Sequence, residues 1–394
     1  MSRLVISTVG TSLLTNEINE RKDPKEWVKL LNKTANLSSA IITDDSNDSE
    51  YSEAYKIIQK LKDRAKAKLD DSNILEIREA SAELNGIYAL YDEKLENAKP
   101  DTHILIATDT LQGEVAAQLI ESFLRNQGLN NIILWIEPEL SLASSNIFTE
   151  TIAKLIPKIE KTIQKGESKG KKVIFNLVGG FKALQGYFNT IGMFYADEVI
   201  YIFEGSNELV KIPKLPITIN IKEVEIYKVP LAMMEQGEIS TSDTEVEKIV
   251  KDIPEEWIVT DREEMILSTW GQLIWNQCKN ELLSQDLLDF PRIDYKKQGN
   301  FLVDYQNIDK DDKMKKIKLQ ETIAQVAQKL TLSKGNTQIL FSGGLDFNRY
   351  NNTSIDHFRI NDSLRVSCQA IGNTLHLRYY GTHDHIYKKE GIKR

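Results

Sequence analysis

The sequence has few of the residues that build disulfides, cysteine zinc sites or membrane spans. Its two cysteines, Cys278 and Cys368, are far apart in the chain and support neither a disulfide framework nor a cysteine-based metal site. No segment approaches the roughly 18 consecutive apolar residues of a membrane-spanning helix. The N-terminal MSRLVISTVGTSLL has no signal-peptide pattern. We therefore expect a cytoplasmic protein with no membrane partner.

Histidine is also scarce, and it is unevenly placed. Four of the five histidines lie in the last 38 residues, 357–394. Charge is divided in the same way. Residues 291–394 carry 18 Lys and Arg against 11 Asp and Glu, a net charge of +7, whereas residues 1–290 carry 32 against 47, a net charge of −15. The two ends of the chain are thus expected to meet different partners.

The length of 394 residues, with 41% hydrophobic and 27% charged, suggests two or three domains with cores of their own. We place one domain at residues 1–228, a linker and helical connector at 229–290, and a second domain at 291–394. The stretch EQGEISTSDTE (235–245) is typical of a linker. Apolar residues at helical spacing over 263–283 indicate a packing helix.

Predicted strands and amphipathic helices alternate in residues 1–203, which indicates an α/β fold with a mostly parallel sheet and helices on both faces. Strands are expected at 4–8, 74–77, 103–108, 131–136, 172–178 and 198–203, and helices near 50–69, 82–96, 113–127, 146–165 and 181–195. Residues 211–229 are expected to be extended. The C-terminal region predicts a weak strand at 301–305, a basic helix at 312–330, and short strands over 357–370 and 375–387.

Three loops follow predicted strands, where a doubly wound sheet places its ligand crevice. They are STVGTSLL (7–14), ATDTLQGE (107–114) and NLVGGFKALQGY (176–187). Their hydroxyls, glycine N–H groups and lysine suit an anion that also offers hydroxyls or base edges. The loops contain no GxxxxGK[ST] or GxGxxG motif. The candidate contacts are Gly10, Thr11, Ser12, Thr108, Asp109, Thr110, Gly179, Gly180 and Lys182.

The segments STVGTSLL, ATDTLQGEVAA and NLVGGFKALQG resemble the CARF domain, the Rossmann-like sensor of type III CRISPR systems. The resemblance covers about residues 1–225, and NxxGGFK is its most specific part. It implies binding of a cyclic oligoadenylate at a homodimer interface, because a ring of four or six identical nucleotides shares the two-fold symmetry of the dimer. Family frequency favours tetra-adenylate.

The resemblance also assigns residues by motif position. It adds Asn176 to the contacts given above. Some CARF domains cleave their activator, and here the hydroxyls of Thr11 and Ser12, with Lys182 stabilising charge, could do so. By the same resemblance, cyclic oligoadenylate is an activator and not a cofactor.

The C-terminal tail, FRINDSLRVSCQAIGNTLHLRYYGTHDHIYKK, is rich in Arg, His and Tyr. Cleavage of RNA without a metal needs a base for the 2′-hydroxyl, cations for the phosphorane and an acid for the 5′-oxygen, and these residue types can supply all three. Asp356, Asp362 and Asp384 are scattered rather than clustered as a two-metal nuclease requires. We therefore expect a metal-independent ribonuclease without a cofactor. The candidates are His357, Arg359, Arg365, Arg378, His383, His385 and Tyr387.

HFRINDSLRVSCQA (357–370), the Gly372-Asn373 turn and LHLRYYGTHDHIY (375–387) resemble the core of RelE-type toxins. The resemblance covers about residues 295–394, including the basic helix and ILFSGGLDFNRY (339–350). It implies an endoribonuclease that cuts mRNA on the ribosome. The whole chain therefore resembles a CARF–RelE fusion ribonuclease, with a Rossmann-like CARF sensor, a helical middle segment and a C-terminal α+β RelE-like domain.

By motif position, Arg365 matches the family's strand Arg that contacts the scissile phosphate. Arg359 and His357 match the basic pair on the preceding strand, and Tyr387 matches the closing Tyr. His383 stands where the family most often has Arg. Because a His with a pKa near 6.5 can move a proton at neutral pH, we hypothesise that His383 or His385 is a general acid or base. Arg359 and Arg365 would stabilise the transition state.

Two alternatives stay open. Arg378 to His383 spells R-x4-H, the signature of HEPN ribonucleases, although that family places the motif on helices and LHLRY is strand-like. A CARF-based transcription regulator would instead bind DNA through a winged helix-turn-helix at 240–290. That segment is acidic and offers few basic residues to phosphates.

Overall fold

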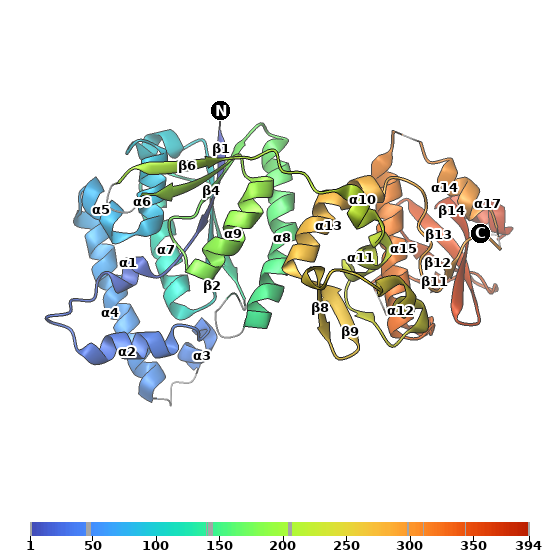
Figure 1. Ribbon diagram of the computed structural model, residues 1–394, viewed down its shortest axis with the longest axis horizontal. Helices are drawn as coiled ribbons and strands as arrows, with labels where there is room; N and C mark the ends of the chain where they lie inside the picture. The colour runs from blue at the N-terminus through green and yellow to red at the C-terminus, as the bar shows by residue number, and fades with distance from the viewer. Residues whose placement is uncertain are drawn as a thin grey trace. The chain divides into compact units, whose positions relative to one another are not determined.

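The computed structural model describes residues 2–44, 49–138, 140, 145–203, 207–297, 299–309, 311–342 and 344–392. The chain forms two compact units, Met1–Ile217 and Thr218–Arg394 (Figure 1). We refer to them as the N-terminal unit and the C-terminal unit. Within the described residues, no helix combines the length and the apolar character needed to span a membrane.

A six-stranded sheet in the order β3-β2-β1-β4-β5-β6 forms the centre of the N-terminal unit. Its strands pair in parallel except for the antiparallel pair β5 and β6. The strand order reverses between β1 and β4, the position at which such sheets place their ligands. This arrangement confirms the predicted α/β, Rossmann-like fold. The strands are β1 (Arg3–Thr8), β2 (Thr102–Thr108), β3 (Ile132–Glu137), β4 (Lys172–Asn176), β5 (Glu198–Ile202) and β6 (Leu209–Pro213).

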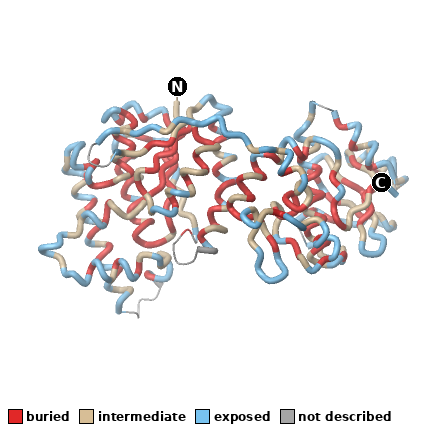
Figure 2. The backbone as a smooth tube through the Cα atoms, viewed as in Figure 1, coloured by how far each residue is buried: buried red, intermediate tan, exposed pale blue. Residues whose placement is uncertain are grey.

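Helices cover both faces of this sheet because the central strands bury apolar residues on both sides (Figures 1 and 2). Ile174 of β4 faces a core shared with α4 and α7. The next residue, Phe175, packs on Phe188 of α9 with ring centroids 6.1 Å apart. The helices are α1 (Ser12–Thr15), α2 (Lys25–Thr34), α3 (Ser39–Asp44), α4 (Ser49–Asp71), α5 (Ile74–Ala80), α6 (Ala82–Leu90), α7 (Leu111–Asn126), α8 (Ser145–Glu167) and α9 (Lys182–Tyr195), with a 3-10 turn at Leu95–Ala98.

The strand predicted at 74–77 is wrong, since these residues open helix α5. Asn73 accepts a hydrogen bond from the Glu76 backbone, and the Glu76 side chain accepts one from the Asn73 backbone. This reciprocal capping box fixes a helix start where apolar residues alone indicate a strand. The extended region predicted over 211–229 is correct only at β6, because α10 (Ile221–Glu225) and α11 (Lys228–Met234) follow.

The C-terminal unit contains a five-stranded sheet, β10-β14-β13-β12-β11, and a three-stranded sheet, β7-β9-β8. One hydrophobic core runs from Val224 to Tyr380 and includes Trp275 of α13, so the segment expected as a connector packs with the segment expected as a separate domain. The remaining elements are β7 (Ile239–Ser240), α12 (Thr244–Val250), η2 (Glu255–Trp257), β8 (Ile258–Asp261), β9 (Glu264–Leu267), α13 (Thr269–Leu282), β10 (Ile293–Asp294), α14 (Phe301–Gln306), α15 (Lys313–Leu332), α16 (Gln338–Phe341), β11 (Asn348–Arg349), β12 (Asp356–Arg359), β13 (Leu364–Ile371), β14 (Thr374–Thr382) and α17 (His383–Glu390).

One predicted strand of this unit is a helix, and another ends at Thr382 and is followed by a helix. At 301–305, Phe301 and Tyr305 are buried while Leu302 and Val303 are exposed, which is the four-residue period of helix α14. At the tail, β14 ends at Thr382, whose hydroxyl accepts the backbone N–H of His385 and caps α17. The basic helix predicted at 312–330 is confirmed as α15.

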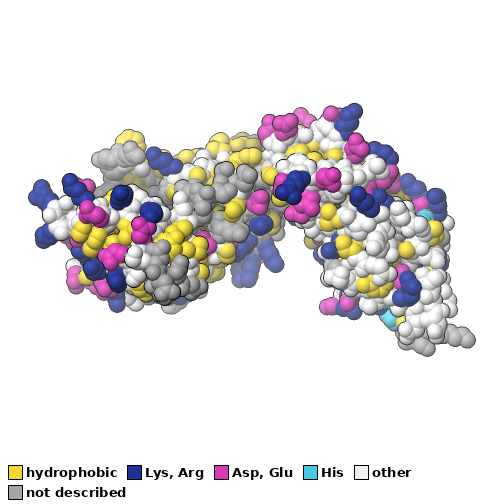
Figure 3. Space-filling view, turned by 90° about the horizontal axis from the view of Figure 1, so that it is seen from below, with side chains coloured by type: hydrophobic (Ala, Val, Ile, Leu, Met, Phe, Trp, Pro, Cys, Tyr) yellow, Lys and Arg dark blue, Asp and Glu magenta, His cyan; other side chains and the backbone are white. Residues whose placement is uncertain are grey.

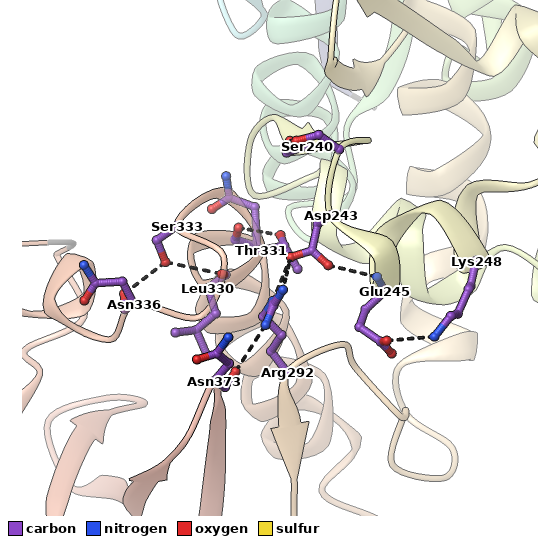
Figure 4. A network of polar contacts seen from close by, with 12 residues as sticks. Ser240, Asp243, Glu245, Lys248, Arg292, Leu330, Thr331, Ser333, Asn336 and Asn373 are labelled. Atoms are coloured by element: carbon purple, nitrogen blue, oxygen red, sulfur yellow. Dashed lines mark hydrogen bonds and ion pairs between the residues drawn. The ribbon is translucent and has the colours of Figure 1, made fainter.

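Within this unit, a buried ion pair joins the start of helix α12 to the residue before strand β10. Asp243, at the start of α12, accepts a hydrogen bond from Arg292 at 2.7 Å, and Figure 4 shows the Arg292 guanidinium reaching on to the Asn373 carbonyl. The Asp243 side chain is fully buried. Because an unpaired buried charge is costly, this contact fixes α12 against β10 and the β13–β14 hairpin.

Candidate functional site

The loops after β1, β2 and β4 meet at the carboxyl edge of the sheet around a pocket of about 380 Å³, the loop pocket. Seven predicted contacts line it: Gly10, Thr11, Ser12, Thr108, Thr110, Gly179 and Gly180. The structure thus brings all three loops together. Asn36 and Phe181 line the same pocket and were not identified from the sequence.

Three predicted contacts do not line the loop pocket. Asn176 is fully buried, and its amide donates to the Ser7 hydroxyl and the Glu83 carbonyl. It therefore connects the start of the third loop to β1 and α6. Asp109 is half-buried, and its backbone carbonyl accepts the N–H of Ser39. Lys182 is exposed at the first position of α9.

Two glycines bring the first and third loops into contact. A Cβ on Gly10 would lie 3.0 Å from the backbone nitrogen of Gly180, closer than side chains normally approach. Gly180 itself has φ +97°, a conformation that other residues rarely adopt. The glycines are therefore needed for the loops to meet, apart from any ligand.

Glu83 is a buried carboxylate at the base of the loop pocket that sequence reasoning missed. It accepts the Gly10 N–H at 2.7 Å and the Ser81 hydroxyl at 2.8 Å. A Cβ on Gly179 would lie only 1.9 Å from its Oε1. A glutamate in the first turn of a helix looks like an ordinary dipole contact in sequence, so nothing distinguished it.

Two carbonyls of the third loop already accept hydrogen bonds within the protein. The carbonyl of Gly179 accepts the Thr8 hydroxyl at 2.6 Å and the Gln185 amide at 3.2 Å, and Gln185 also donates to the Leu177 carbonyl. The N–H groups of Gly179 and Gly180 donate to no described residue. Free N–H groups beside a helix start form a site suited to an anion.

In the C-terminal unit, four rings form two stacked pairs joined by an edge-on contact, the His–Tyr cluster: Tyr350, His357, His383 and Tyr387. The ring of His357 stacks on Tyr350 at 4.2 Å, and His383 stacks on Tyr387 at 4.2 Å. Tyr387 meets Tyr350 edge-on at 5.3 Å. Three predicted residues, His357, His383 and Tyr387, are therefore brought together from β12 and α17.

The arginines lie beside the His–Tyr cluster. Arg365 on β13 is the cross-strand partner of Arg359 on β12. Burial lowers the pKa of His357 to about 4, and the charge of Arg365 and the neighbouring His383 act in the same direction. His357 is consequently a neutral imidazole at pH 7, able to accept a proton. Its Nδ1 is buried and hydrogen-bonds to no described residue, and the buried hydroxyl of Tyr350 interacts with the Arg365 guanidinium.

A hollow of about 320 Å³ opens at Arg359 and is also lined by Asp346, Asn361 and Asp362. Arg359 forms an exposed ion pair with Asp346 at 3.0 Å. On the face drawn in Figure 3, Lys and Arg side chains lie among Asp and Glu over the C-terminal unit. Arg359 and Arg365, paired across β12 and β13, are the guanidiniums that suit a phosphate at the cluster.

Two other tail residues face different surroundings. His385 lies 3.3 Å from the carboxylate of Asp304 on α14, which also accepts the Tyr380 N–H. Arg378 on β14 pairs with Glu390 at 2.8 Å. Among the described residues, the ring contacts of the His–Tyr cluster therefore include neither His385 nor Arg378.

Among the described residues, no group of three or more His, Cys, Asp and Glu side chains is arranged to hold a metal ion.

Residues 78–215 match a family model described as "CRISPR-associated protein (Cas_APE2256)". The matched residues run from α5 through β6, so they include Glu83 and the loops after β2 and β4. The first loop and the entire C-terminal unit lie outside them. This similarity supports a CRISPR-associated role.

Proposed function

We propose that the protein is a metal-independent endoribonuclease of type III CRISPR defence that is activated by a cyclic oligoadenylate and cuts mRNA on the ribosome. The observation that carries the ribonuclease proposal is the His–Tyr cluster beside Arg359 and Arg365. It collects a neutral imidazole, a second imidazole, phenols and guanidiniums at one end of a small sheet. These groups match the three tasks of RNA cleavage.

In the proposed reaction, His357 accepts the proton of the 2′-hydroxyl as that oxygen attacks the phosphorus. Arg365 and Arg359 stabilise the negative charge of the phosphorane, as cations placed at developing charge do. His383, stacked on Tyr387, donates the proton to the departing 5′-oxygen. The products would be a 2′,3′-cyclic phosphate and a free 5′-hydroxyl.

The loop pocket supports the activator proposal. Its free N–H groups suit phosphates, and its hydroxyls from Thr11, Ser12 and Thr110 suit ribose or base edges. A homodimer could present two such pockets to a ring with two-fold symmetry. Tetra-adenylate is the first ring to test, and Thr11, Ser12 and Lys182 are the residues to change when its degradation is measured.

The two alternative functions receive no specific support. Arg378 of the R-x4-H sequence lies on strand β14 and not on a helix, and it is paired with Glu390. In the acidic middle segment, the short turn η2 (Glu255–Trp257) precedes the β8–β9 hairpin, and residues 241–290 hold four Lys and Arg against 12 Asp and Glu. Such a surface repels DNA.

The test compares two variants on translating ribosomes with labelled mRNA, with and without cyclic tetra-adenylate. Arg365→Gln should reduce cleavage by roughly 10²–10³-fold and leave tetra-adenylate affinity unchanged. Lys182→Ala should weaken tetra-adenylate binding, and cleavage at saturating activator should recover. Absence of activator-dependent cleavage by the unaltered protein would overturn the proposal. Lys169→Ala, an exposed lysine remote from the loop pocket, is the matched control.

A further inference from the structure

Tyr350 occupies the centre of the His–Tyr cluster, although it was not among the candidate residues from the sequence. Its ring lies face-on against His357, with 4.2 Å between centroids and 20° between planes, and meets Tyr387 edge-on. Only 4% of Tyr350 is exposed. It is therefore the ring that lies between the imidazole of β12 and the phenol of α17.

We propose that Tyr350 is a positioning residue that covers the face of the His357 imidazole, keeps water from it and so holds it neutral for proton transfer. The catalytic consequence rests on the proposed ribonuclease function, whereas the effect on His357 does not. The buried Tyr350 hydroxyl interacts with the Arg365 guanidinium, whereas the ring makes the face-on contact with His357. The cover is therefore assigned to the aromatic ring, which Tyr350→Phe retains.

Burial is the largest cause of the lowered pKa of His357, ahead of the neighbouring cations. Asp346 and Asp356 act in the opposite direction and raise that pKa. The titratable and charged groups around the stacked pair come from every element packed against it: Asp346, Asp356, Arg365, His383, Tyr387 and Glu390. Since Tyr350 supplies no charge of its own at neutral pH, its contribution is the cover that its ring provides.

The experiment measures the titration of His357 by NMR of histidine-labelled full-length protein. Only five histidines are present, so each signal can be assigned with single His→Gln variants. In the unaltered protein and in Tyr350→Phe, the midpoint should lie well below 6.5. In Tyr350→Ala it should rise by roughly one pH unit or more, because water reaches the imidazole. Tyr350→Leu keeps apolar volume, guards against misfolding, and should shift the midpoint the same way by less.

An unchanged midpoint in the folded Ala or Leu variant would overturn the proposal, and so would an equal shift in Tyr350→Phe. A second measurement follows the pH dependence of kcat/KM for RNA cleavage. Its acid limb should move upward with the NMR midpoint. If the unaltered protein cleaves no RNA, the proposed function fails while the titration result stands by itself.

Discussion

At the scale of single residues, the charge balance around the His–Tyr cluster is set by close pairs and by burial. His357 is held neutral by its surroundings, whereas Arg359 is exposed and already paired with Asp346. An RNA phosphate at Arg359 would compete with that carboxylate. Substrate binding at Arg359 is therefore weakened by the free energy of the Arg359–Asp346 ion pair.

Replacing Asp346 tests this competition. Exposed ion pairs are worth about 0.2–1 kcal/mol, so Asp346→Asn should lower KM for RNA by a factor of about 1.5 to 5 and leave kcat nearly unchanged. Initial cleavage rates over a range of RNA concentrations give both constants. Asp362→Asn is the matched control, because Asp362 lines the same hollow and has no such ion pair with Arg359. A higher KM for Asp346→Asn would contradict this account.

At the scale of elements, α17 places two members of the His–Tyr cluster, and buried contacts hold it on the sheet. Glu390 has a side chain only 1% exposed and accepts hydrogen bonds from Ser367 and Arg378. Near the N-terminal end of α17, His385 lies against Asp304, and the next residue, Ile386, is fully buried. His383 and Tyr387 owe their positions to these contacts.

Removing the buried carboxylate should release α17. Glu390→Ala leaves the half-buried Arg378 without its partner, which costs about 3–5 kcal/mol at buried sites. We expect a lower free energy of unfolding for the C-terminal unit in urea, loss of RNA cleavage, and unchanged tetra-adenylate binding. The control is Lys389→Ala on the same helix, whose side chain is exposed. Equal stability of the two variants would show that the buried pair does not hold α17.

The strands of the N-terminal sheet and helix α15 could be predicted because their apolar periodicity is long and regular. The helices at 74–77 and 301–305 could not be predicted, because short apolar runs occur in both strands and helices. A capping box determines the helix at 74–77, and the burial of Phe301 and Tyr305 determines the helix at 301–305. Seven of the residues that line the loop pocket were predicted from loops after parallel strands. Tyr350 and Glu83 were not, because their contacts with Tyr387 and Gly10 join segments far apart in sequence.

At the scale of the whole molecule, we propose activator binding at the loop pocket of the N-terminal unit and RNA cleavage at the His–Tyr cluster of the C-terminal unit. Linking them requires that the activator bind two states of the protein with different affinity. The similarity to a CRISPR-associated family covers residues 78–215, which belong to the N-terminal unit. The chemistry proposed for the C-terminal unit therefore carries the central claim.

The most direct measurement is the chemistry of the cut ends, with labelled mRNA, ribosomes and cyclic tetra-adenylate. We predict 2′,3′-cyclic phosphate and 5′-hydroxyl ends that appear only with the activator, and no cleavage of a message carrying a 2′-deoxy residue at the cut position. Fragments ending in a 3′-hydroxyl and a 5′-phosphate would contradict attack by the 2′-oxygen, and with it the role proposed for His357 and its neighbours.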